Sequence, residues 1–162
     1  PDYDIVTGDA TAAYGGALTR AVRSLVYLRP DTVLVFDSLA SATPRTWEWN
    51  LHALSPMKAK GPRELEIEQD GVRMCVRLLV APEGAFTQTD QFTTPPQGKY
   101  PAQWHLRYAS AEKSLQVRFL VLMEIGCQGA RVDAVTKRDG IELKIATRNL
   151  IFNDSQGVKV VR

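Results

Sequence analysis

Apolar and polar residues alternate along much of the chain, which is typical of strands that bury one face. In residues 45–53 every second side chain is apolar, from Trp47 to Ala53, and the side chains between them are polar. The longest regular alternation covers residues 113–125. Because successive side chains of a strand point to opposite faces, both stretches are predicted strands with one buried side.

Residues 32–39, TVLVFDSL, carry apolar side chains on both faces, which predicts a central strand covered on both sides. Residues 18–28 are predicted as the strand before it. A helix is the alternative there, since apolar residues also recur every three or four positions, but β-branched residues and the missing helix start signal favour a strand. The turn Arg29-Pro30-Asp31 joins the two strands.

The remaining pattern consists of short alternating segments separated by turn residues. Asp70-Gly71 and Asp139-Gly140 are predicted hairpin turns, and residues 81–102 are predicted as one long loop. Further strands are predicted at 3–6, 63–69, 72–80, 104–109, 131–137, 141–147, 150–152 and 158–161. This arrangement favours an all-β fold, a two-layer antiparallel β-sandwich, with residues 1–162 as a single domain.

Composition narrows the range of partners. The 20 basic and 18 acidic residues are interspersed, with no basic run, so we expect no nucleic-acid partner. No apolar run is long enough to cross a bilayer, and we expect no membrane partner. The chain begins with Pro1 rather than Met, and we expect it to be a piece of a longer protein.

The two cysteines, Cys75 and Cys127, lie far apart and have no Cys or His at ligand spacing, so no metal site is predicted at either one. They can form a disulfide only if the segments that carry them meet. Two free thiols are the simpler expectation.

Two groups of polar residues are candidates for function. Asp37 interrupts an apolar strand and needs cations or donors nearby, so a buried polar network of Arg20, Arg23, Asp37 and His52 is predicted, with a structural role. Alternatively, Asp37 caps the turn after its strand. His52 shares a strand face with Glu48 and Asn50, which suits a groove or a metal, although a hydrogen-bonded structural histidine is the more common case.

The second group lies in and beside the long loop. Amides, a carboxylate and aromatic rings suit the hydroxyls and apolar faces of sugars, so a substrate-binding site is predicted at Gln88, Asp90, Gln91, Tyr100 and Trp104. The alternative is an ordinary loop packed by its own aromatic residues. No nucleophile elbow and no glycine-rich phosphate loop is present.

Several short segments together resemble the C-terminal β-sandwich portion of heparinase II/III-like polysaccharide lyases. The close match covers roughly residues 3–53. It rests on Gly8-Asp9-Ala10-Thr11 with Tyr14, Leu18-Thr19-Arg20 with Arg23, Leu28-Arg29-Pro30-Asp31, Val33-Leu34-Val35-Phe36-Asp37 and Trp49-Asn50-Leu51-His52-Ala53, with a weaker match at Thr89-Asp90-Gln91-Phe92 and Trp104.

The resemblance implies a periplasmic or secreted parent enzyme with an upstream α/α-toroid, which cleaves uronate-containing polysaccharides by β-elimination. It places the catalytic residues and a divalent metal site upstream, so no catalytic residue, metal ligand or cofactor is assigned to this chain. We expect the chain alone to be inactive and to support or complete the active-site cleft. The expected partners are an acidic polysaccharide and the helical domain, and a homo-oligomer is a further candidate assembly.

The alternative function is a non-catalytic carbohydrate-binding or structural β-sandwich module. An upstream helical domain in the parent gene would favour the lyase hypothesis. A stop codon or a signal sequence immediately upstream would favour the independent module.

Overall fold

The computed structural model describes residues 2–161, which form fourteen strands and one short 3-10 helix, η1 (Thr11–Tyr14). The strands are β1 (Tyr3–Asp9), β2 (Arg20–Leu28), β3 (Thr32–Arg45), β4 (Glu48–Ala53), β5 (Lys58–Gly61), β6 (Glu64–Gln69), β7 (Val72–Val80), β8 (Gly84–Thr89), β9 (Trp104–Ser110), β10 (Ser114–Ile125), β11 (Val132–Lys137), β12 (Gly140–Ile145), β13 (Arg148–Asn153) and β14 (Gly157–Val161).

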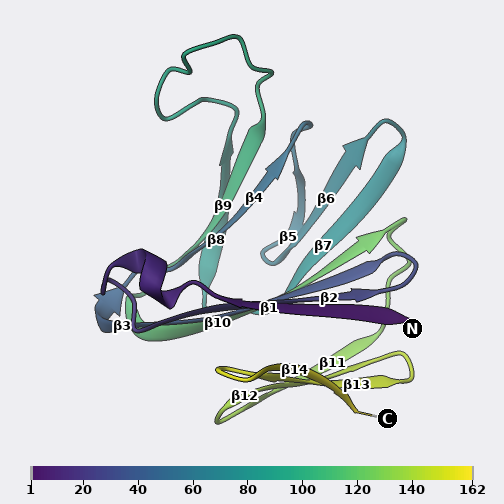
Figure 1. The fold of residues 1–162 in the computed structure, drawn as a ribbon. Helices are drawn as coiled ribbons and strands as arrows, with labels where there is room; N and C mark the ends of the chain where they lie inside the picture. Colours follow the sequence, from purple (N-terminus) through teal and green to yellow (C-terminus); the bar gives the residue numbers. More distant parts are fainter. Residues whose placement is uncertain (1, 162) are drawn as a thin grey trace.

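All the strand pairs are antiparallel, and they form three sheets (Figure 1). The large sheet has the order β1-β2-β3-β10-β7-β6-β5, the four-stranded sheet β11-β12-β13-β14, and the three-stranded sheet β4-β9-β8. The predicted all-β antiparallel fold is confirmed. The strands are distributed over three sheets rather than two, because the large sheet is apolar on both faces and packs against a smaller sheet on each side.

The first hydrophobic core lies between the large sheet and the three-stranded sheet. Three aromatic residues come from the three-stranded sheet or lie beside it: Trp47, Trp49 and Tyr108. They pack with side chains of the large sheet such as Val35 and Phe119. These apolar residues occupy the inward positions of the predicted alternation in 45–53, while the polar positions of β4 are exposed. The alternation therefore predicted the buried face of β4.

The second core lies between the large sheet and the four-stranded sheet. Phe36 and Leu120 of the large sheet are fully buried there, beside Leu143, Leu150 and Phe152. The rings of Phe36 and Phe152 lie 5.3 Å apart, in the range of favourable aromatic pairs. β3 thus supplies residues to both cores, as expected for its doubly apolar sequence, and β10 does the same.

Several local predictions are confirmed and others are corrected. The strand over 18–28 is β2, not a helix, and Asp70-Gly71 forms the predicted hairpin turn with both residues at positive φ. The other hairpin turns one residue earlier than predicted, since Lys137 pairs with Gly140. The long loop is shorter than expected because its first part forms β8, which pairs with β9.

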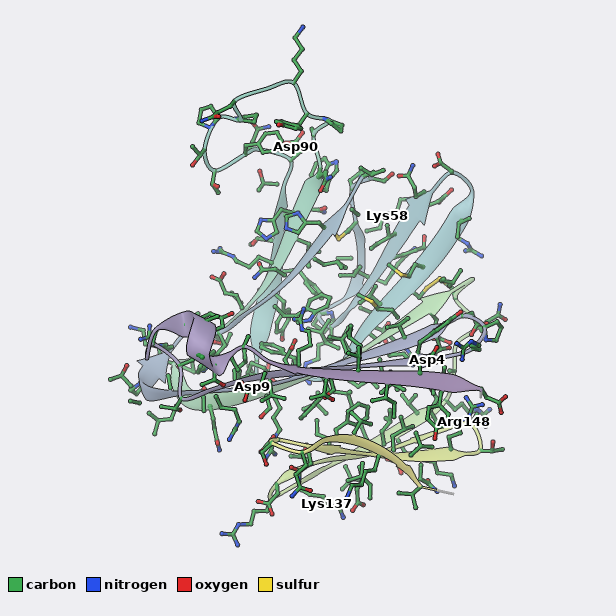
Figure 2. The ribbon with its side chains drawn as sticks, in the orientation of Figure 1. Asp4, Asp9, Lys58, Asp90, Lys137 and Arg148 are labelled. Atoms are coloured by element: carbon green, nitrogen blue, oxygen red, sulfur yellow. A yellow bond between two sulfur atoms is a disulfide. The ribbon has the colours of Figure 1, made fainter. Side chains whose placement is uncertain are left out.

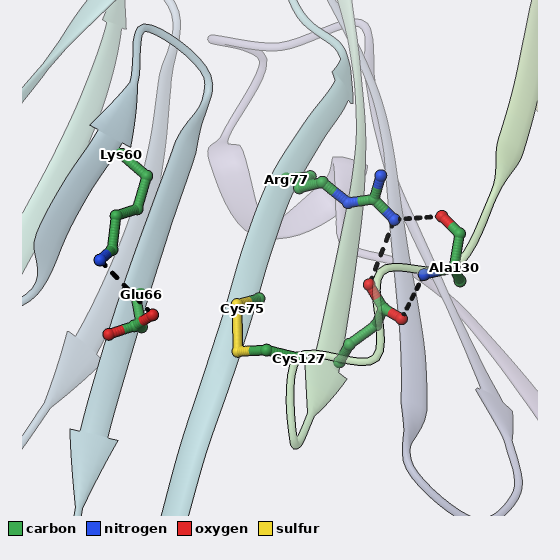
Figure 3. The surroundings of a disulfide bond; sticks show 7 residues. Lys60, Glu66, Cys75, Arg77, Cys127 and Ala130 are labelled. Atoms are coloured by element: carbon green, nitrogen blue, oxygen red, sulfur yellow. Dashed lines mark hydrogen bonds and ion pairs between the residues drawn. A yellow bond between two sulfur atoms is a disulfide. The ribbon is translucent and has the colours of Figure 1, made fainter.

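The prediction of two free thiols is wrong, because Cys75 and Cys127 form a disulfide with a Cα–Cα distance of 5.0 Å (Figure 3). Cys75 lies on β7, next to the end of β10, and a sharp turn through Gly126 brings Cys127 back towards it. Beside the bond, buried Glu124 pairs with Arg77 at 3.1 Å, and both residues hold the backbone of Ala130. The disulfide and this ion pair fix the chain where it leaves the large sheet for the four-stranded one.

No helix within residues 2–161 is long and apolar enough to cross a membrane.

Candidate functional site

The best candidate site is a groove of about 410 Å³ beside the outer strand β4 of the three-stranded sheet. It is also lined by residues of β1, β2 and β3 of the large sheet and by Tyr14 of η1. Its polar lining comes from Tyr14, Arg23, Asp37, Glu48 and Asn50. All the lining residues lie between Gly8 and Asn50 in the sequence, and the folding of β1 to β4 against one another brings them together.

An ion pair between neighbouring strands lies in the groove. Arg23 on β2 is directly opposite Asp37 on β3, and it donates Nε–H to Oδ1 at 2.5 Å and Nη2–H to Oδ2 at 2.8 Å. The hydrogen bond to Asp37 is the main reason why the pKa of Arg23 is raised above its ordinary value, and the charge of Asp37 adds to it against the effect of burial. The carboxylate is buried, whereas 56% of the Arg23 side chain is exposed. Arg23 is thus held rigidly with its outer edge open to the groove.

The exposed face of the three-stranded sheet continues the groove as a strip of polar side chains. Glu48 pairs with Arg107 at 3.2 Å, and the Asn50 oxygen lies 2.9 Å from His105 Nε2. The imidazoles of His52 and His105, opposite each other across β4 and β9, stack with their centroids 4.5 Å apart. We name these five residues the β4–β9 strip. It presents planar and charged groups to solvent over the width of two strands.

The groove and the strip are suited to binding polar ligands. The Arg23 guanidinium can meet a carboxylate or sulfate group, while Asn50 and Tyr14 can bond to hydroxyls. The groove lining carries the positive charge of Arg23 and the negative charges of Asp37 and Glu48, and Arg107 beside the groove pairs with Glu48. The groove therefore offers directed hydrogen bonds rather than a strong field.

Metal-type donors rarely lie close together in the described part of the chain. Within residues 2–161, the only group of three metal-type donors lying close together is Glu66, Cys75 and Cys127. Its two sulfurs are bonded to each other and are not available as thiolate ligands.

The four residues of the predicted buried network do not form one cluster. Arg23 and Asp37 form the pair in the groove, whereas Arg20 lies on the opposite face of β2 and approaches Asp154 at 3.8 Å. His52 is exposed on the other sheet and stacks on His105. The network prediction is therefore corrected to one pair and two separate residues. Asp37 does not act as a turn cap, because β3 continues past it to Arg45.

The five loop residues predicted to bind sugar are also dispersed. Gln88 bonds to both backbone groups of Met57, at 3.0 and 2.7 Å, and Trp104 packs against the first core. Asp90 accepts a hydrogen bond from Gln91 in the loop that projects from the β8–β9 end of the molecule (Figure 2). Tyr100, also in this loop, is 66% exposed. Gln88 and Trp104 thus also have packing roles, although Gln88 is exposed.

The sequence pattern identified Glu48, Asn50 and His52 as neighbours on one strand face, but it gave no reason to include Arg107 or His105. Those two belong to the site because β9 pairs with β4 in one particular register. Polar residues at alternate positions of residues 104–109 were the only available signal.

The fold is a layered antiparallel β domain, similar to a part of heparinase III and heparan sulfate lyase structures. The chain superimposes over 99% of its length on the heparinase III BT4657 gene product, with a TM-score of 0.67 and 11% identity. It matches heparan sulfate lyase HepC from Pedobacter heparinus over 99% of its length, with a TM-score of 0.65 and 13% identity. A further heparinase III structure gives a TM-score of 0.67 at 9% identity, with 99% of this chain covered.

The chain spans about a quarter of the length of these structures, 26%, 26% and 25% respectively. At such low identities the likeness concerns the fold. No protein-family model matches the chain, and no curated protein matches it. The fold expected from the sequence resemblance is confirmed over almost the whole chain.

Proposed function

We propose that this chain is a supporting β domain of a heparinase II/III-like polysaccharide lyase, which contacts an acidic polysaccharide through the groove and does not carry the catalytic residues. The observation that supports this most directly is Arg23, held by Asp37 in a groove whose other polar groups suit hydroxyls. The shared fold with heparinase III structures supports the type of parent protein.

In this proposal each groove residue has a defined task. Asp37 orients the Arg23 fork, so that little side-chain entropy is lost when Arg23 meets a sugar carboxylate or sulfate. Asn50 and Tyr14 bond to ring hydroxyls. The bond-breaking steps belong to the helical domain of the parent, and this chain completes one wall of the cleft.

The disulfide favours the proposal that the parent protein resides in an oxidising compartment, since structural disulfides persist mainly in secreted, periplasmic and cell-surface proteins. We therefore place the parent enzyme in the periplasm or outside the cell. There it would meet extracellular polysaccharides.

The test is a binding titration of the chain with heparan sulfate, with dextran as the neutral control, followed by an ultraviolet assay for unsaturated uronate. We expect weak, saturable binding to heparan sulfate, none to dextran, and no product. Arg23→Gln should weaken the binding about tenfold, as expected for the loss of a charge-assisted contact.

The matched control is Arg138→Gln, since the side chain of Arg138 is exposed to solvent and does not line the groove. Equal losses in both variants would indicate a diffuse charge effect and contradict the groove. Product formed by the chain alone would overturn the non-catalytic part of the proposal. Tight binding without any functional link to a lyase domain would favour an independent carbohydrate-binding module.

A further inference from the structure

A second cavity, of about 280 Å³, is lined by residues of β2, β10 and β11 and by the end of β7 with the two residues after it. Its polar lining is Arg20, Gln116, Arg118 and Thr136, and Val80 and Pro82 belong to its apolar lining. This cavity shares no lining residue with the groove. The cavity is therefore a separate site from the groove.

The two arginines of the cavity are bonded very differently. Arg118 donates to both oxygens of Asp154, at 2.7 and 2.5 Å, and to the backbone oxygens of residues 137 and 138. Arg20 has Asp154 as its nearest acid, at 3.8 Å from Nη2, which is too long for a hydrogen bond. Its Nε is buried and has no acceptor within the described residues. Arg118 is therefore saturated, and Arg20 is not.

The charges of the cavity are also unequal. Two guanidinium groups share the single carboxylate of Asp154, which leaves one positive charge in excess. Asp154 stays ionised at neutral pH: burial alone would raise its pKa, but the hydrogen bonds from Arg118 and Ser38 and the charges of Arg118 and Arg20 lower it below the ordinary value. One added monoanion would neutralise the cluster.

Only 26% of the Arg20 side chain is exposed, so its charge is partly desolvated without the hydrogen bonds that normally compensate for burial. A planar fork of donors matches a carboxylate or a sulfate in shape as well as in charge. Gln116 and Thr136 are exposed and can bond to the same group or to a hydroxyl beside it. The apolar side of the cavity suits the carbon skeleton of a small molecule.

We propose that this cavity binds one carboxylate or sulfate group, with Arg20 as the main donor and Gln116 and Thr136 beside it. The ligand that carries this carboxylate or sulfate group is either a sugar acid or a free small anion, because both present such a group. Binding gives the Arg20 guanidinium the acceptor that Asp154 does not provide.

The experiment is a calorimetric titration of the whole chain with sodium glucuronate, sodium sulfate and sodium acetate, with ionic strength held constant by sodium chloride and glucose as the neutral control. We expect saturable binding of the anions and none of glucose. Tighter binding of glucuronate than of acetate would identify a sugar acid as the carrier, and equal binding would identify a free small anion. No saturable heat with any of the three anions, or the same heat with glucose, would overturn the proposal.

Variants test the position of the site. Arg20→Gln should weaken anion binding at least about tenfold, while Arg138→Gln, on a side chain 95% exposed, should leave it unchanged. If Arg20→Gln fails to fold, Gln116→Ala serves as the second variant, because Gln116 is exposed and its replacement should leave the fold intact. We expect Gln116→Ala to weaken anion binding several-fold. Unchanged affinity in Gln116→Ala and in a folded Arg20→Gln would overturn the assignment. Arg23 does not line this cavity, so a folded Arg23→Gln variant should keep its affinity for the small anions, and the two proposals can fail separately.

Discussion

Arg118 and Asp154, 36 positions apart, join the large sheet to the four-stranded sheet through two parallel hydrogen bonds of 2.7 and 2.5 Å. Asp154 belongs to the turn between β13 and β14, and the same arginine holds the turn between β11 and β12 through the backbone oxygens of residues 137 and 138. Ser38 of β3 adds a hydrogen bond to Asp154 at 2.8 Å. One guanidinium thus attaches two turns of one layer to its neighbour.

We expect Asp154→Asn to lower the free energy of unfolding by about 3 kcal/mol at pH 7, because it leaves the partly buried Arg118 without its counter-ion. The pKa of Asp154 is lowered in the folded chain, so its contribution is present above the ordinary carboxyl pKa and is lost as the pH falls through the folded value. Urea unfolding from pH 7 down to pH 3 measures both effects.

The control for Asp154 is Asp133→Asn, since no ion pair or side-chain hydrogen bond of Asp133 is found within residues 2–161. Acid should destabilise the wild type and this control equally. The decrease in the free energy of unfolding between neutral and acid pH should be smaller in Asp154→Asn than in the wild type. The same pH dependence in all three proteins would contradict the role given to Asp154.

Removal of the disulfide should destabilise the chain strongly. Cys75 and Cys127 are 52 positions apart, and a cross-link over a loop of that length contributes about 4 kcal/mol in the chain-entropy model. We expect the double variant Cys75→Ala with Cys127→Ala to unfold at much lower urea concentration than the wild type.

The matched measurement is unfolding of the wild type with and without a reductant, together with a thiol assay of the unfolded protein. No free thiol should appear without reductant. The reductant should shift the wild type to the unfolding midpoint of the double variant and leave that variant unchanged. Two free thiols in the untreated protein would refute the disulfide.

Gly140 and Gly8 provide a matched pair for testing the packing between strands. A Cβ on Gly140 would lie 1.9 Å from the backbone oxygen of Phe152, whereas a Cβ on Gly8 would meet nothing within 4 Å. A backbone atom in a central strand pair cannot move away cheaply. Gly140→Ala should therefore cost about 3 kcal/mol or more, in the upper range for overpacking.

Gly8→Ala should change the stability by less than about 1 kcal/mol, since neither space nor backbone conformation opposes it. Thermal unfolding of the two variants side by side gives the comparison. Similar midpoints for both would show that β12 and β13 are not packed as described.

Phe119 and Leu120 test whether the two cores unfold together. Both are fully buried neighbours on β10, but Phe119 belongs to the first core and Leu120 to the second. Each change to Ala should cost about 3–5 kcal/mol. Because both cores share β10, we expect one transition in both variants, with fluorescence and circular dichroism giving the same midpoint. Two separated transitions would mean that the small sheets unfold independently.

Much of the fold could be predicted because local sequence and tertiary structure agree. The doubly apolar β3, the alternation of β4 and the turn at Asp70-Gly71 are all readable from short windows. β5 and β8 were missed because they hold few apolar residues and exist by pairing with β6 and β9. Pairing partners are decided by the whole sheet, which a short window does not contain.

The site was less predictable because it depends on register and on contacts between distant segments. Strand periodicity alone separates Arg20 from Arg23, since an odd spacing puts them on opposite faces of β2. The pairing of His52 with His105 depends on the register between β4 and β9, and the approach of Arg20 to Asp154 depends on how the sheets stack. Nothing in the local pattern around these residues indicates their partners.

Because the large sheet supplies residues to both cores, the sequence of such a chain can vary in some places more freely than in others. In the middle of β3 and β10 no position faces water, so nearly every substitution there must satisfy a packing constraint on one side or the other. The outward faces of the two small sheets carry no such constraint. New specificities can therefore arise on the outside of the molecule, strand by strand, while the middle layer keeps the architecture unchanged.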